Sequence, residues 1–275
     1  MSLAEFIDPD PLVVDKNDSL STYLRLLSKR ENDKAVVMEN RRINGRQVKT
    51  VAGVVTGRDI LGKIVSERLR LSSPGRLRVS GFMSTQPFTI KPDASIRDAL
   101  TAMASKSIGI LPVVDGFNFK GAVYRRSLLK LAFHIGDPAS KAASRVFLRT
   151  RLGDSLLMLR QSMLESGEGF AVVVDDEGKP CGYITVMDLA YAFATFLENV
   201  PEKHRKERIS ELVVRDYYRR DLPVVKEDAE LGRVAETLYE KRSRGVLVTG
   251  ERGVVGVVRE HDLISYLALT SLGIG

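Results

Sequence analysis

The chain has 275 residues, 44% of them hydrophobic, and a formal net charge of +7. This is enough apolar material to bury a core, and no apolar run approaches the ~20 residues that a bilayer-spanning helix needs. The single cysteine, Cys181, excludes an internal disulfide, and residues 1–8 lack the basic and apolar pattern of a secretion signal, so we expect a cytoplasmic protein with no membrane contact. The positive charge favours anionic partners, although acids and bases alternate in runs such as 202–208, which is typical of a solvated helix face.

Each quarter of the chain is predicted to begin with a short strand and then a helix. The predicted strands are residues 11–14, 87–90, 146–148 and 223–225. Apolar residues then recur at spacings of three and four, as in Leu20, Leu24 and Leu27, which places them on one helix face. Ser19, Ser95 and Ser155 suit the starts of three of these helices.

A buried strand, a turn and a returning strand follow in each quarter, which predicts a hairpin. The buried strands are residues 35–38, 111–114, 171–174 and 246–248. The first hairpin has a longer arm, residues 39–49, which we expect to form an extended ribbon around Asn44-Gly45.

The returning strand carries a pattern that occurs four times: a glycine, two apolar residues, then a polar residue with an acid three positions later. The copies begin at Gly53, Gly121, Gly182 and Gly256, and an apolar helical run follows each one. A repeated strand-to-helix junction implies a repeated supersecondary unit. The sequence therefore predicts an α+β fold of four β-α-β-β-α repeats, and because one unit is too small to bury its apolar faces, the units should pair.

Residues 82–93, together with Leu111-Pro112-Val113-Val114-Asp115 and the glycine pattern, resemble the cystathionine beta-synthase (CBS) domain. The resemblance implies repeats at about 8–70, 80–135, 144–200 and 212–270. It also implies two Bateman modules, 1–140 and 141–275, stacked as a disc. The four-copy layout is similar to that of the gamma subunit of AMP-activated protein kinase and of stand-alone archaeal proteins. Members of this family are regulatory, and many bind AMP, ADP, ATP or S-adenosylmethionine between paired domains.

The polar residue and the acid of the pattern are candidate nucleotide ligands. Free backbone N–H groups at a helix start favour a phosphate, Thr56 or Thr185 adds a hydroxyl, and Asp59 or Asp188 can accept hydrogen bonds from both ribose hydroxyls. The alternative is a capping box that simply starts the helix. The second copy has Tyr124 and Ser127 in these places. This divergence favours a ligand role in the first and third copies, because a box needed for folding should persist in every copy.

Further candidates are basic or polar residues near the same junctions. In the fourth repeat Asp262 keeps the acid, Arg259 replaces threonine and can bind a phosphate bidentately, and the resemblance assigns Arg244 to a phosphate. Lys34 and Arg58 are the candidates of the first repeat, and the resemblance places Thr89 at the adenine edge. Arg58, Arg125 and Arg126 lie near helix starts, where a bound anion would explain them, although plain solvent exposure would as well.

No enzyme motif or metal-ligand spacing is present, since His134, His204 and His261 are scattered and Cys181 reads as a core residue. The sequence therefore favours a non-enzymatic adenine-nucleotide sensor that binds AMP, ADP or ATP as a ligand, not a cofactor, and signals to an unidentified protein partner, with a homodimer also open. S-adenosylmethionine is less favoured because its positive charge gains nothing in a cationic cleft. The alternatives are a nucleic-acid-binding protein, which needs a one-sided basic stripe, and a ligand-free interaction scaffold.

Overall fold

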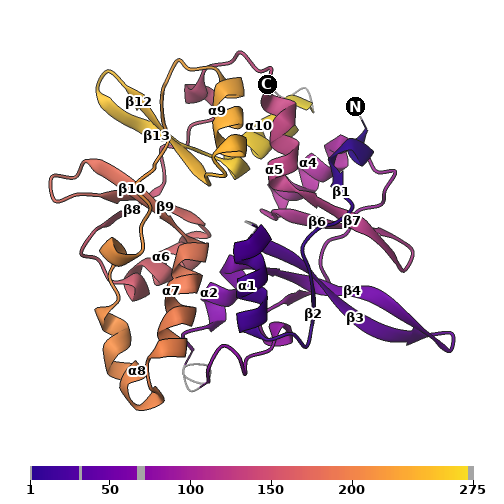
Figure 1. Ribbon diagram of the computed structural model, residues 1–275. Coiled ribbons are helices and arrows are strands. Elements are labelled where there is room, and N and C mark those ends of the chain that lie inside the picture. Colours follow the sequence, from indigo (N-terminus) through magenta and orange to yellow (C-terminus); the bar gives the residue numbers. More distant parts are fainter. Residues whose placement is uncertain (1, 31–32, 67–71, 272–275) are drawn as a thin grey trace. The chain divides into compact units, whose positions relative to one another are not determined.

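The computed structural model describes residues 2–30, 33–66 and 72–271. Four units of the same design follow one another, which confirms the predicted α+β fold (Figure 1). In the first, third and fourth repeats a strand runs parallel to the second strand, which pairs antiparallel with the third; in the second repeat, the bridge Ile90↔Val113 takes the place of the parallel strand.

The first and third repeats have all five elements, as does the fourth. In chain order the first consists of β2 (Val13–Asp15), α1 (Leu20–Arg30), β3 (Lys34–Ile43), β4 (Arg46–Thr56) and α2 (Gly57–Lys63). The third consists of β8 (Leu148–Arg151), α6 (Leu156–Ser166), β9 (Phe170–Val174), β10 (Pro180–Thr185) and α7 (Val186–Asn199), and α8 (Glu202–Arg208) follows it.

The second and fourth repeats differ in the entry strand, which only the fourth has, and in the length of the last helix. The second consists of α4 (Ile96–Ser105), β6 (Ile110–Asp115), β7 (Asn118–Tyr124) and α5 (Arg125–Leu128), which continues as a 3-10 turn, η3 (Leu129–Ala132). The fourth consists of β11 (Val224–Lys226), α9 (Leu231–Glu240), β12 (Gly245–Gly250), β13 (Gly253–Arg259) and α10 (Glu260–Ser271).

Each sheet takes its outer edge from a segment that leads into a different repeat, which we call the exchanged segment. β5 (Ser84–Thr85), which precedes the second repeat, pairs with β4 of the first, and β1 (Ile7–Asp8) pairs with β7 of the second. Single bridges, Tyr183↔Arg219 and Ser144↔Val257, do the same for the third and fourth repeats. The first and second repeats thus each take an edge from the segment that leads into the other, and the third and fourth do the same.

The glycine of the repeated pattern lets the exchanged segment lie directly against the returning strand. A Cβ placed on Gly53 would lie 2.5 Å from the carbonyl oxygen of Ser84, and a Cβ on Gly256 would lie 2.5 Å from that of Ser144. Gly121 and Gly182 meet the carbonyls of Asp8 and Arg219 in the same way. The glycine is required because any side chain there would collide with a neighbouring backbone.

The described residues form two compact units, each with its own core. One contains Pro11–Pro87 and Leu148–Arg220, that is, the first and third repeats, and the other contains Met1–Asp10, Phe88–Phe147 and Asp221–Gly275, with the second and fourth. In the first unit α2 packs against α7 and α6, and Arg160 of α6 donates to the carbonyls of Leu61 and Gly62 at the end of α2, at 2.7 and 2.8 Å. In the second unit α4 and η3 pack against α10. The predicted modules 1–140 and 141–275 stay a prediction, because core packing groups alternate repeats whereas the exchanged segments link consecutive ones.

Two local expectations were wrong. Residues 87–90 form no strand, and only the single bridge Ile90↔Val113 joins them to the second repeat's sheet. The strand in this part of the chain is β5, which lies before Pro87 and pairs with β4 of the first repeat. The strand predicted at 146–148 begins only at Leu148. Proline lacks an N–H donor, which explains why a stretch beginning at Pro87 contributes little to a ladder. The long arm at 39–49 is confirmed as the end of the β3–β4 hairpin.

Candidate functional site

In the first repeat, Thr56 ends β4 and Asp59 lies in the first turn of α2, where together they form a capping box. Oδ2 of Asp59 accepts from the backbone N of Thr56 at 2.8 Å and from its Oγ1 at 2.6 Å. Oδ1 accepts from Oγ of Ser84, in the exchanged segment, at 2.7 Å. Asp59 forms no ion pair with the part of the chain that the structure describes, so its outer oxygen is held only by an exposed neutral hydroxyl.

The third repeat repeats this box with a different outer partner. Oδ2 of Asp188 accepts from the N of Thr185 at 2.9 Å and from its Oγ1 at 2.7 Å. Oδ1 accepts from Nε and Nη2 of Arg219, at 2.9 and 2.8 Å, so the guanidinium holds this oxygen with two donors. Burial alone would lower the pKa of Arg219, but the hydrogen bonds and charge of Asp188 outweigh burial and raise it.

In the fourth repeat, the arginine that replaces threonine binds the acid of its own motif. The backbone N and Nε of Arg259 each donate to Oδ2 of Asp262 at 2.8 Å, and Nη2 donates to Oδ1 at 3.0 Å. Both side chains are 14% exposed. Asp262 thus still accepts from the backbone N of the residue before the helix, whereas the Arg259 side chain, which has only donors, accepts from no helix N–H; both carboxylate oxygens of Asp262 have partners.

Arg244 lies beside a buried acid that the sequence analysis missed, Glu260. The Glu260 side chain, only 4% exposed, starts α10 and lies 3.8 Å from Nη1 of Arg244. Arg126 of the second repeat donates to the same carboxylate from Nε and Nη2, at 3.2 and 3.1 Å. Arg126 and Arg244, which the sequence analysis offered as ligands of a bound anion, thus both contact the carboxylate of Glu260.

The remaining candidates, Lys34, Arg58 and Thr89, have different surroundings. Lys34 starts β3, is paired across the ladder with Thr56, and forms an ion pair with Asp33 at 2.6 Å. Arg58 is exposed and donates to the carbonyl of Gly167 in the third repeat. Thr89 is exposed and lies outside any strand.

The strand-to-helix junction of the second repeat, at the start of α5, has no capping box. Tyr124 precedes α5 without a side-chain cap, and the Ser127 hydroxyl donates to the carbonyl of Tyr124 at 2.7 Å. Arg125 donates to the carbonyl of Ile108 at 2.8 Å. The closing helix of the second repeat, α5, is also the shortest of the four closing helices, which agrees with the loss of the cap.

Ser84 and Arg219 are the site residues that sequence reasoning missed. They occupy the same place: Ser84 pairs with Val54 and Arg219 with Tyr183, each being the residue after the pattern's glycine. Aligning the segments before the second and fourth repeats would have found the position, but only the structure shows that it faces the aspartate of another repeat.

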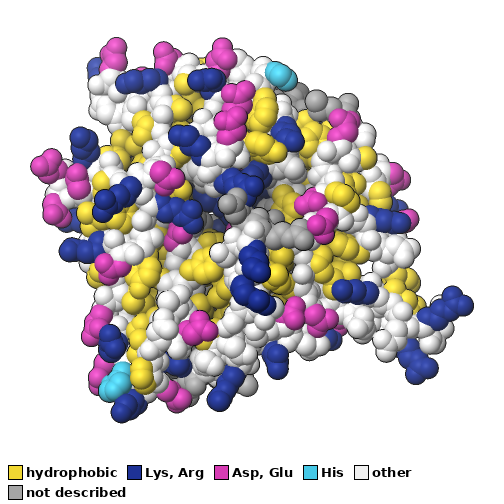
Figure 2. All heavy atoms as spheres, in the orientation of Figure 1, with side chains coloured by type: hydrophobic (Ala, Val, Ile, Leu, Met, Phe, Trp, Pro, Cys, Tyr) yellow, Lys and Arg dark blue, Asp and Glu magenta, His cyan; other side chains and the backbone are white. Residues whose placement is uncertain are grey.

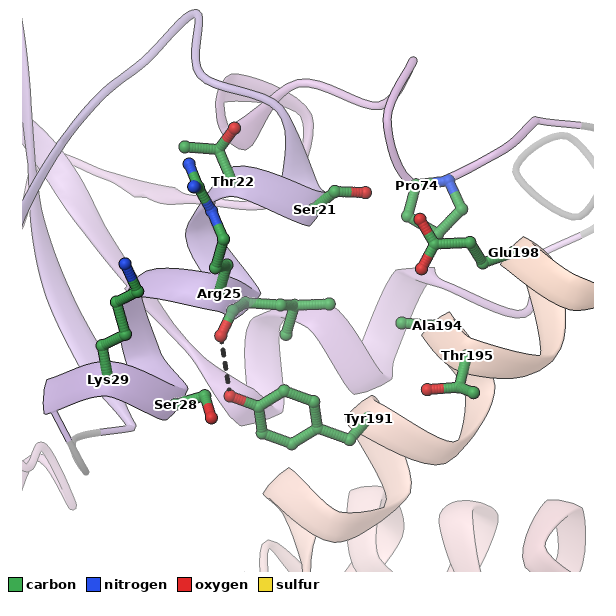
Figure 3. A pocket seen from close by; sticks show the side chains of 11 residues that line it. Ser21, Thr22, Arg25, Ser28, Lys29, Pro74, Tyr191, Ala194, Thr195 and Glu198 are labelled. Carbon is green, nitrogen blue, oxygen red and sulfur yellow. Dashed lines mark hydrogen bonds between the residues drawn. The ribbon is translucent and has the colours of Figure 1, made fainter.

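A groove of about 660 Å³ lies between α1 and α7, close to the third-repeat junction (Figure 3). Arg25 and Lys29 of α1 and Thr195 and Glu198 of α7 lie on its two sides. Tyr191 closes one end by donating to the carbonyl of Leu24 at 2.9 Å, and burial, with the charge of Asp188, raises the pKa of Tyr191 to about 12.

The described residues contain neither a metal site nor a helix that could span a membrane. No group of three His, Cys, Asp or Glu side chains is arranged to hold a metal ion in that part of the chain. Within the same residues, every helix is too short or too polar to cross a bilayer. Cys181 is partly buried, and burial raises the pKa of its thiol, which makes it a poor nucleophile.

Comparison with known proteins identifies the repeated unit. The sequence model of the CBS domain matches residues 79–134, 142–195 and 214–269, which together make up more than half of the chain. These are the second, third and fourth repeats; the first shares their element order.

Relatives of known sequence share only part of the chain. The uncharacterized protein MJ1404 of Methanocaldococcus jannaschii is 30% identical over 132 residues, which are 47% of this chain and 31% of MJ1404. The A-adding tRNA nucleotidyltransferase of Aquifex aeolicus is 28% identical over 127 residues, 46% of this chain and 15% of the enzyme. The chain thus spans less than half the length of these relatives.

Among solved structures, that of MJ1225 from Methanocaldococcus jannaschii, described as a candidate archaeal homologue of g-AMPK, superposes with a TM-score of 0.83 at 17% identity. The match covers 97% of this chain and 100% of MJ1225. A conserved protein of Pyrococcus horikoshii has a TM-score of 0.61 at 15% identity, covering 97% and 100%. These matches identify the fold of nearly the whole chain.

Proposed function

Because the chain belongs to the CBS-domain family, we propose that it is a regulatory protein, not an enzyme, that binds an adenine nucleotide and reports its presence to a partner. The observation that carries the proposal is the junction of the first repeat. Asp59 is held there by neutral donors alone, and Thr56, which donates to it, lies across the ladder from Lys34. The fold shared with MJ1225, a candidate homologue of g-AMPK, supports the same role.

The chemistry of this junction suits a nucleoside phosphate. Ribose hydroxyls can replace the Ser84 hydroxyl on Oδ1 of Asp59 at little cost, because one neutral hydrogen bond is exchanged for another. The first backbone N–H groups of α2, the Thr56 hydroxyl and the Lys34 ammonium would meet the phosphate. A ligand held this way stabilises one arrangement of the repeats over others, and a partner protein would read that population shift.

The other junctions are harder to occupy. At Asp188 a ribose must displace the two-donor contact of Arg219, and at Asp262 it must displace Arg259. Charge-assisted hydrogen bonds are about twice as strong as neutral ones. We therefore propose that the first repeat fills at the lowest nucleotide concentration and that Thr185, Asp188, Arg244, Arg259 and Asp262 form weaker sites.

Calorimetric titration of the full chain with AMP, ADP and ATP tests the proposal. We expect saturable binding that falls at least tenfold in Asp59→Asn, since the amide keeps the cap but loses the charge that favours ribose hydroxyls. The matched control is Asp98→Asn, because Asp98 forms the same box with Ser95, at 3.0 and 2.8 Å, at the start of α4 rather than at a strand-to-helix junction. Absence of heat with all three nucleotides, or equal losses in both variants, would leave a scaffold in which the boxes only cap helices.

A further inference from the structure

The β3–β4 hairpin of the first repeat extends as a two-stranded ribbon beyond the strands that flank it. β2 pairs only with residues 36–38 and β5 only with residues 53–54, so from Glu39 to Thr50 the two strands pair with each other alone (Figure 1). The tip is the turn Asn44-Gly45, whose φ values of 48° and 80° fit a tight hairpin turn. The other three repeats have no such extension.

One face of this ribbon is entirely polar. The ladder pairs Asn40 with Lys49 and Arg42 with Gln47, and because side chains alternate along strands, these four lie on the same face. All four are exposed. The opposite face carries Arg41, Ile43, Arg46 and Val48, of which Ile43 and Val48 are half-buried.

The ribbon carries an uncompensated positive charge. Its one acid, Glu39, is bound by Lys16 at 2.6 Å and by Arg41, so Glu39 neutralises no residue closer to the tip than Arg41. The side chains of Arg42, Arg46 and Lys49 form no hydrogen bond or ion pair with the rest of the described chain. Elsewhere acids and bases are interspersed on the visible surface, whereas basic side chains lie at the end of the ribbon (Figure 2).

We propose that this ribbon binds double-stranded DNA by entering the major groove with its polar face. The free part of the ribbon is about 16 Å long, and a two-stranded ribbon fits a groove about 12 Å wide. Arg42 and Lys49 contact phosphates or guanine, while Asn40 and Gln47 present the paired donor and acceptor that match adenine. A partner protein with an acidic face would explain the cations but not the two amides between them.

Fluorescence anisotropy with a labelled 20-base-pair DNA duplex, between 50 and 200 mM KCl, tests this inference on the full chain. We expect binding that weakens with salt, because each neutralised phosphate releases a counterion. The variant Arg42→Gln/Lys49→Gln should lose at least about tenfold in affinity at 100 mM KCl and about two units of the log–log salt slope. The matched control, Lys203→Gln/Lys206→Gln, removes two exposed cations from α8 and should stay within about twofold.

Three outcomes would overturn the inference: no duplex binding at 50 mM KCl, equal losses in both double variants, or tighter binding of double-stranded RNA or labelled polyglutamate than of DNA. Unchanged thermal midpoints for both variants show that the loss comes from the surface and not from unfolding. Nucleotide titration plays no part in the readout, so failure here leaves the proposed sensing function untouched.

Discussion

The first and third repeats share one backbone design and differ in the side chain that completes the site. Both end the returning strand with a threonine that caps the next helix, complete the capping box with an aspartate three residues later, and have a glycine that accommodates the exchanged segment. In the first repeat that segment offers Ser84 to the aspartate, and in the third it offers Arg219. The repeated motif therefore builds the scaffold, while a residue outside the motif decides how open the carboxylate is.

The second repeat extends this comparison to the loss of the box. Without a threonine or an acid its closing helix shortens to α5, whereas the fourth repeat, in which Asp262 still accepts from the backbone N of Arg259, keeps a long α10. Divergence among the copies thus has a structural cost. Because a lost box shortens the helix, the difference between the copies supports a ligand role for Thr56, Asp59, Thr185 and Asp188 less strongly than we expected from the sequence.

The largest expected effect tests what the two repeats share. Gly182→Ala and Gly53→Ala should each reduce the free energy of unfolding by about 2 to 4 kcal/mol, because the new Cβ would collide with the carbonyl of Arg219 or Ser84 and neither backbone can move away freely. Urea unfolding of the full chain measures the loss.

The control for this pair is Gly62→Ala in α2, where no atom lies within 4 Å of the added Cβ. Alanine there should stabilise the protein by about 0.5 to 1 kcal/mol, since helix propensity rises and no contact changes. Similar losses at Gly62 and at Gly182 would refute the close-approach explanation.

Exchanging the outer partners should interconvert the two junctions. Arg219→Ser should strengthen nucleotide binding at the third repeat by about tenfold, or ~1.4 kcal/mol, and Ser84→Arg should weaken binding at the first repeat by a similar factor. Calorimetry on each variant in an Asp59→Asn or Asp188→Asn background assigns the change to one junction. If neither exchange alters affinity, the outer oxygen of the aspartate takes no part in binding.

The smallest effect concerns the position three residues after the aspartate, which is Tyr191 in the third repeat and Gly62 in the first. The pKa of Tyr191 is raised from 10.0 to about 12. The stability that its neutral phenol contributes is therefore complete below pH 10 and is lost as pH rises through 12. Tyr191→Phe should therefore show a shallower fall in unfolding free energy between pH 10 and 12 than the parent chain. Parallel curves would mean that Tyr191 titrates normally.

Most of the fold could be predicted because its signals are local. Apolar spacings of three and four indicated the helices, and Asn44-Gly45 indicated the long hairpin. The alternative that Thr56 and Asp59 form a capping box could be recognised from residues 56–59 alone. The outer contacts were not predictable in the same way. Arg219 lies 31 residues from Asp188 in a stretch without hydrophobic periodicity, and Glu260 gave no signal that it would be buried between two arginines.

The crossing of edge strands has a practical corollary for anyone who engineers this molecule. Trimming the residues before Pro11, which look like a dispensable leader to the first repeat, would strip Ile7 and Asp8 from the border of the second repeat's sheet, where they lie beside Val123 and Ala122. The destabilised sheet would be that of the second repeat, which is far from the truncated end in the sequence. Terminal fusions should therefore be joined through a spacer that leaves this border intact.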